Sequence, residues 1–190
     1  MAGARVTYGN QVTTSSYIHA GPGRKVLADV IYHLTLYDSG GVCKWDDSFS
    51  GLVVNEGLTT LIDYTLKSGS GGVPAWYVSL LDGSGPAAVN PTDVMSSHAG
   101  WTENTDYSEA TRVALVLGTI VNGAVDNVAS LASFTISANG NLAGAFITSS
   151  SVKGGGAGKL YDAGGFIDGV RPVRTNDTLE ISATLSVSAA

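Results

Sequence analysis

The sequence predicts a mainly β fold, an antiparallel β-sandwich of jelly-roll type with one short α-helix and an extended N-terminal arm. Three observations predict it: a strictly alternating C-terminal segment, a series of short β-rich runs between glycine-rich turns, and a single segment with helical spacing. The chain has 190 residues, a length that fits one domain with an arm. We expect the arm and the first strand in residues 1–44 and the sandwich in residues 45–190.

The clearest strand is predicted for residues 178–188. Apolar side chains alternate there with polar ones, and the apolar set is Leu179, Ile181, Ala183, Leu185 and Val187. Successive side chains on a strand point to opposite faces. The segment is therefore expected to have one dry face and one wet face, as in a sandwich.

Further strands are expected at residues 29–37, 75–81, 112–117, 130–137, 141–149 and 159–161. The strand at 75–81 carries apolar side chains at both alternations, which predicts burial on both faces. The runs 130–137 and 141–149 flank Ala138-Asn-Gly140. An Asn-Gly pair between two β-rich runs is typical of a two-residue hairpin turn, so we expect these two strands to pair with each other.

One helix is expected, over residues 55–67. Its apolar residues Leu58, Leu61, Ile62 and Leu66 fall at offsets of three, four and eight, which places them on one stripe. A helix this short is not stable alone. We therefore expect the stripe to pack across an open end or a face of the sheet.

The composition bounds the function. Charged residues make up 14% of the chain, against about 25% in typical proteins, and the formal net charge is −6. An acidic chain with scattered Lys and Arg is a poor ligand for nucleic acid. The N-terminus lacks the apolar segment of a secretory signal, and no run approaches the roughly 18 apolar residues of a membrane span. We expect synthesis in the cytoplasm and no contact with membranes.

Known catalytic and cofactor motifs are not found in the sequence. Residues 153–160, KGGGAGKL, lack the first glycine and the final hydroxyl residue of a phosphate-binding loop. The single cysteine and three widely spaced histidines do not match a zinc site, and neither a calcium loop nor a nucleophile elbow occurs. The sequence therefore predicts no cofactor and no metal.

Residues 92–112, TDVMSSHAGWTENTDYSEATR, concentrate the side chains of chemical interest. If the loop brought them together, His98, Glu103, Asp106, Ser108 and Glu109 could form an acid–base site. Nothing in their spacing requires it.

The same segment has a structural interpretation, which we favour. Its hydroxyl, amide and carboxylate side chains can hydrogen-bond nearby backbone. Trp101 and Tyr107 can anchor the loop on the sheet, and Arg112 can pair with Glu103 or Glu109. On this interpretation the protein is not an enzyme, and no residue is assigned as catalytic.

From about residue 50 to 188 the chain resembles a family of small structural proteins of tailed bacteriophages and prophages. The resemblance rests on motifs in a fixed order: Asn55-Glu-Gly-Leu58, Trp76-Tyr-Val-Ser-Leu-Leu-Asp-Gly83, Ser97-His-Ala-Gly-Trp-Thr-Glu103, Tyr107-Ser-Glu-Ala-Thr-Arg112, Gly144-Ala-Phe-Ile-Thr-Ser149, Lys159-Leu-Tyr161 and Asp177-Thr-Leu179. It implies a virion component. Some members resemble capsid cement, or decoration, proteins, which sit on the outer shell and bridge coat subunits. Residues 1–45 are not covered.

On this resemblance the expected partners are the major capsid protein and further copies of the chain, as a homodimer or homotrimer. Tyr8, Tyr17 and Trp45 are the candidate anchors, because aromatic side chains dominate interface energies. Two alternatives stay open. One is a tail, neck or fibre component that binds host surface glycans. The other is a hydrolase that uses His98 with Glu103 or Asp106.

Overall fold

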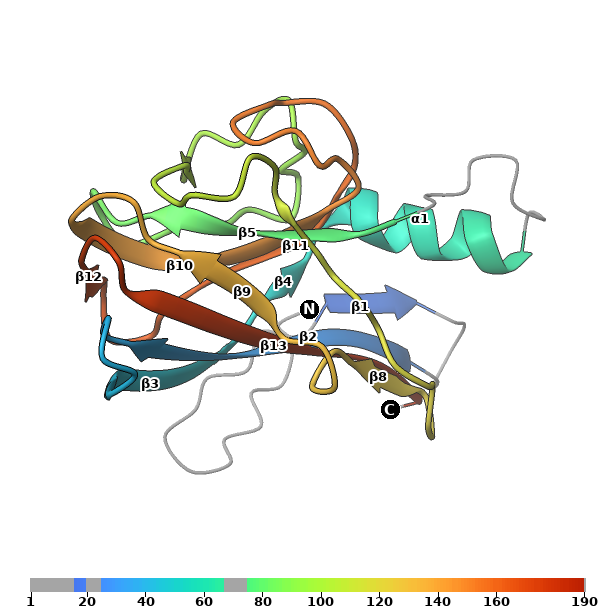
Figure 1. Ribbon diagram of the computed structural model, residues 1–190. Helices are drawn as coiled ribbons and strands as arrows, with labels where there is room; N and C mark the ends of the chain where they lie inside the picture. The colour runs from blue at the N-terminus through green and yellow to red at the C-terminus, as the bar shows by residue number, and fades with distance from the viewer. Residues whose placement is uncertain (1–15, 20–24, 67–74, 190) are drawn as a thin grey trace.

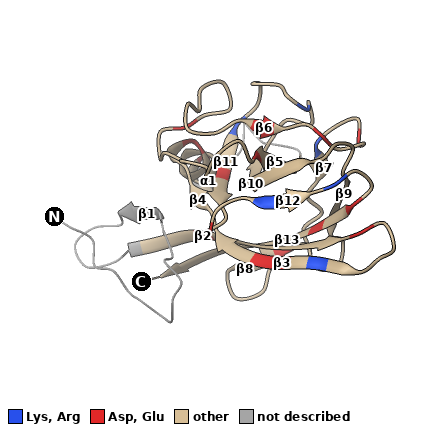
Figure 2. Cartoon of the chain, turned by 90° about the vertical axis from the view of Figure 1, so that its left-hand side faces the viewer, with Lys and Arg blue, Asp and Glu red and all other residues tan. Residues whose placement is uncertain are grey.

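The protein is an antiparallel β-sandwich with one helix, which confirms the predicted fold class (Figure 1). The computed structural model describes residues 16–19, 25–66 and 75–189. Two sheets face each other, and the main hydrophobic core fills the space between them. Charged residues are sparse and scattered along the described part of the chain (Figure 2). No helix among the described residues is long and apolar enough to cross a membrane.

The first sheet is built on two long strands. Within the described residues it contains β1 (Ser16–His19), β2 (Lys25–Tyr37), β3 (Cys43–Ser50), β8 (Ala124–Asp126), β9 (Ala132–Thr135) and β13 (Thr178–Ala189). Strands β2 and β13 pair over their whole length, from Tyr37 opposite Thr178 to Val26 opposite Ala189. Residues 25–44, grouped with the arm in the sequence analysis, thus supply β2 and the start of β3 to this sheet.

Strand β13 confirms the predicted alternation and also shows where it fails. Leu179, Ile181 and Ala183 are fully buried between the sheets. Leu185 is only half-buried, and Val187, on the same face, is 42% exposed. The loss of cover coincides with the end of the sandwich where α1 (Asn55–Leu66) and β8 lie and the two sheets diverge (Figure 1).

The second sheet is centred on β10. Within the described residues it contains β4 (Leu52–Val53), β5 (Tyr77–Asp82), β6 (Glu103–Asn104), β7 (Val113–Ala114), β10 (Gly140–Thr148), β11 (Leu160–Gly165) and β12 (Arg171–Val173). Strand β5 is buried on both faces, as predicted: Val78 and Leu80 belong to the main core, and Leu81 belongs to a second cluster on the other face. The loop residues Met95 and Trp101 complete that second cluster.

The predicted hairpin around Asn139-Gly140 is wrong. Strand β9 pairs with β13 in the first sheet, whereas β10 pairs with β5, β11 and β12 in the second. The chain crosses between the sheets because Ile136 exchanges backbone hydrogen bonds with the turn before β13: its N–H donates to Asp177 O, and its carbonyl accepts from Asn176. Because these bonds continue the pairing of β9 with β13, β9 is not free to pair with β10 across a tight turn at Asn139-Gly140.

Helix α1 packs on β11 and uses only part of the predicted stripe. Leu58 and Leu61 are half-buried, but Ile62 is 39% exposed, and Gly57 and Thr60 are buried instead. The side chain of Leu66 lies outside the described residues. The close approach at Gly57 sets this orientation, because a Cβ there would lie 2.2 Å from the carbonyl oxygen of Tyr161.

We expect Gly57→Ala to destabilise the protein. Alanine favours a helix by roughly 1 kcal/mol over glycine, but here its methyl group overlaps backbone, so the helix has to move at a net cost of about 2 kcal/mol. Urea denaturation measures the change. Gly85→Ala is the matched control, because a Cβ there meets nothing within 4 Å. Equal unfolding midpoints for the two variants would show that the helix is not held this closely.

Candidate interaction surface

Arg112 holds the long loop of residues 92–112 in place. Its side chain is fully buried and makes a bidentate pair with Glu103, with Nε 2.9 Å from Oε1 and Nη2 2.7 Å from Oε2. The guanidinium also donates to the carbonyls of Ser150 and Gly155, at 3.0 and 2.6 Å. The predicted pairing of Arg112 with Glu103 is confirmed, and it joins this loop to the 149–159 loop.

The two aromatic anchors of the loop are also confirmed. Trp101 is 6% exposed and donates from Nε1 to Asp93 Oδ2 at 2.9 Å. Tyr107 is 2% exposed, its hydroxyl lies 3.1 Å from Ser79 Oγ, and burial raises the pKa of this hydroxyl to about 12. Both rings are held by polar partners as well as by packing.

The candidate acid–base residues are engaged separately. His98 stacks on Trp101, with ring centroids 3.7 Å apart, and its Nδ1 lies 3.0 Å from Trp101 O. Glu109 accepts from the backbone N–H of Thr135, and Glu103 is paired with Arg112. In the described part of the chain no hydrogen bond joins His98 to these carboxylates, and no cluster of His, Cys, Asp and Glu could hold a metal ion.

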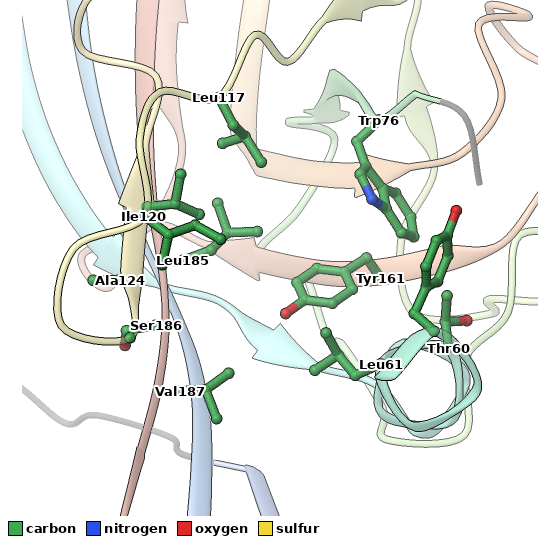
Figure 3. Close-up of a pocket in the computed structure, with 13 residues that line it drawn as sticks. Thr60, Leu61, Trp76, Leu117, Ile120, Ala124, Tyr161, Leu185, Ser186 and Val187 are labelled. Carbon is green, nitrogen blue, oxygen red and sulfur yellow. The ribbon is translucent and has the colours of Figure 1, made fainter. Parts of the chain in front are cut away.

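The sandwich opens into an apolar cleft where its two sheets diverge (Figure 3). The cleft has a volume of about 430 Å³ and lies between α1, the 117–125 segment and the end of β13. Its walls include Leu61, Trp76, Leu117, Tyr161, Leu185 and Val187. None of the 13 described residues that line it is charged. A concave apolar surface of this kind is typical of a binding site.

A β-bulge shapes the inner wall of the cleft. Tyr161 is the extra residue of β11 where the register with β10 shifts. Leu160 and Ala163 belong to the second cluster, whereas Tyr161 points into the main core. Its ring packs on that of Trp76, with ring centroids 5.3 Å apart. Bulges commonly redirect side chains in this way. Burial raises the pKa of Tyr161 above its ordinary value.

The same bulge turns Asp162 inward beside Tyr161. Asp162 is fully buried, and its Oδ1 accepts a hydrogen bond from Tyr32 at 2.5 Å, while its Oδ2 has no hydrogen-bond partner among the described residues. Burial raises the pKa of Asp162 to about 8, the Tyr32 hydrogen bond opposes this, and the charge of Asp29 adds to it. The carboxyl group is therefore mostly protonated at neutral pH.

The rim of the cleft carries exposed aliphatic side chains. Ile120 is 72% exposed, Val121 is 61% exposed and Val187 is 42% exposed. The first two begin a two-residue turn in which Asn122 and Gly123 both have positive φ, 51° and 78°. Val121 and Ala124 exchange backbone hydrogen bonds of 2.9 and 3.0 Å, which closes a type I′ turn. We call residues 120–124 the rim turn.

None of the three predicted anchors is among the described residues that line the cleft. Tyr8 is outside the described residues, and of Tyr17 only the backbone is described, paired with Leu27 in β1. Trp45 is half-buried in β3, donates from Nε1 to Pro172 O at 2.9 Å and packs edge-on against Phe166. The indole of Trp45 is thus used within the sandwich, next to β12, and Trp45 is not one of the residues that line the cleft.

Neither the cleft nor the rim turn was predicted from the sequence. Asn122-Gly123 is the one signal that could have located the turn, because Asn-Gly is the preferred pair of a type I′ turn.

Comparisons with protein-family models, curated proteins and solved structures found no match. The resemblance to phage structural proteins therefore stays a prediction.

Proposed function

We propose that the protein is a structural component of a bacteriophage virion, a cement protein on the capsid outer surface that bridges major capsid subunits. The observation that carries the proposal is a contrast between two regions. In the loop richest in acid–base side chains, His98, Glu103 and Glu109 are engaged in structural contacts, whereas the cleft is an apolar concave surface with an aliphatic rim and no charged residue in its described lining. Such a surface is suited to protein contact.

The motifs that carry the resemblance support the same proposal. Trp101, Glu103, Tyr107 and Arg112 all belong to the most diagnostic stretch, and all four fix the loops on the second sheet. A shell protein needs a rigid scaffold of this kind and needs no reacting group. Their roles here are those of scaffold residues.

The glycan-binding alternative finds less support. Sugar recognition on a tail component would use exposed aromatic platforms. Of the tryptophans in the described chain, Trp101 is buried, Trp45 is half-buried against Phe166, and Trp76 is half-buried with its accessible side in the apolar cleft, where few polar groups are available to a sugar.

Copy number in purified virions tests the proposal. A cement protein should be present on the scale of the major capsid protein, measured by quantitative mass spectrometry of both chains. A stoichiometry of a few copies per particle would favour a tail or neck component. Absence from particles that contain the coat protein would contradict any virion role.

A further inference from the structure

We propose that the cleft is a self-association site, in which the rim turn of one copy enters the cleft of a second copy and the reverse contact forms about a two-fold axis. The inference goes beyond the proposed function and does not depend on it, since it concerns the isolated chain.

The cleft has room for the proposed occupant. A cavity of roughly 150 Å³ lined by aliphatic and aromatic side chains binds benzene, and this cleft measures about 430 Å³. It can therefore accept more than one aliphatic side chain. The rings of Trp76 and Tyr161 pack on each other, with centroids 5.3 Å apart. They form an inner wall against which such side chains would pack.

The rim turn is held in one conformation. Val187 donates from its backbone N–H to Gly123 O at 2.8 Å, which fastens the turn to the end of β13. A Cβ at Gly123 would lie 2.6 Å from Val187 O, so the approach is close. A side chain presented by a rigid turn loses little conformational freedom on binding. Ile120, at the start of the rim turn, is thus pre-positioned as a knob on the face of the cleft.

Charge favours a second copy over a charged partner. The chain has a net charge of −6, so two copies repel each other through most of their surfaces. No described residue that lines the cleft is charged, and the rim turn contains no charged residue. The described lining and the rim turn are therefore surfaces that two acidic chains can bring together without placing a carboxylate in the contact itself.

The placement of knob and cleft indicates a closed dimer. Ile120 is itself part of the cleft lining, so the knob and the cavity share one face of the molecule. A two-fold rotation then lays each knob over the other copy's cleft, and both contacts form at once. This is an isologous interface, which closes at two subunits and does not extend into a filament.

Sedimentation velocity of the full chain over a range of concentrations tests the proposal. The wild-type protein should dimerise, and Ile120→Asp should weaken dimerisation at least about 100-fold, since the carboxylate is buried twice per dimer. Because Ile120 is 72% exposed, the variant should fold normally. Val42→Asp is the matched control, as Val42 is 64% exposed in the β2–β3 turn, and it should dimerise like the wild type.

A mixing experiment tests the reciprocal contact. Val187→Lys places a positive charge on the cleft side, and alone it should also be monomeric. Mixed with Ile120→Asp, it should form a heterodimer in which the new carboxylate on the rim turn of one copy meets the new ammonium group on β13 of the other, while the second contact stays wild-type. Rescue in the mixture would support knob-in-cleft pairing between copies.

Three results would overturn the proposal. One is a wild-type chain that stays monomeric up to about 100 μM, a concentration at which even weak specific interfaces associate. Another is a dimer that Ile120→Asp leaves intact. The third is a monomer whose cleft takes up the uncharged probe N-phenyl-1-naphthylamine and loses it on Val187→Lys, which would assign the cleft to a small apolar ligand.

Discussion

Replacing Arg112 with methionine should destabilise the protein by about 3–5 kcal/mol, the usual cost of removing one member of a buried ion pair. The variant leaves the Glu103 carboxylate, whose side chain is 7% exposed, without its partner. It also leaves the carbonyls of Ser150 and Gly155 without their donors. Urea denaturation followed by tryptophan fluorescence measures the loss.

The double variant Arg112→Met with Glu103→Met separates pairing from packing. Because it contains no unpaired buried charge, it should be more stable than Arg112→Met alone. Arg174→Met serves as the control at an exposed arginine, with an expected change within about 0.5 kcal/mol. If Arg112→Met had the same urea unfolding midpoint as the wild type, the buried pair of Arg112 and Glu103 would have no role in stability.

Asp162→Asn should change how stability depends on pH. In the folded chain the pKa of Asp162 is raised to about 8, so the carboxyl group stays protonated up to about that pH. In the unfolded chain the ordinary pKa of 3.8 applies. The stabilising contribution of this proton is therefore complete below about pH 4 and is lost as the pH rises to about 8. Each unit of pKa corresponds to about 1.4 kcal/mol, so the loss should amount to several kcal/mol.

Urea denaturation of both proteins between about pH 4 and pH 9 isolates this effect, because the other carboxylates are common to both chains. The free energy of unfolding of the wild type, relative to Asp162→Asn, should fall across this range and level off above about pH 8. Asp168→Asn, at an exposed carboxylate, should follow the wild type. Parallel profiles for the wild type and Asp162→Asn would mean that Asp162 is not held protonated.

Local patterns in the sequence predicted the features that depend on local chemistry. The alternation at residues 178–188 predicted β13, and the apolar spacing after Asn55 predicted α1. The pairing of Arg112 with Glu103 was predictable because both charges lie in one loop among residues that must be buried. The structural interpretation of this loop also agrees with the contacts of His98, which lie on Trp101, while Glu103 is paired with Arg112.

Features that depend on pairing between distant strands were not predictable. Two Asn-Gly pairs occur in the chain. The pair at 122–123 forms the type I′ turn, whereas the pair at 139–140 lies where the chain crosses between sheets. The β-rich runs beside each pair do not show which of the two forms a hairpin turn, because the pairing of β8 and β9 with β13 decides it. The cleft likewise results from the divergence of the two sheets, and the inward turn of Tyr161 results from a bulge.

Antibody-gold labelling of intact virions, viewed by electron microscopy, tests the central claim most directly. The proposed role as a shell protein requires label over the whole surface of the head, at a density comparable with that of the coat lattice. Label confined to the tail or its base would contradict a cement function and would make a tail component the better assignment.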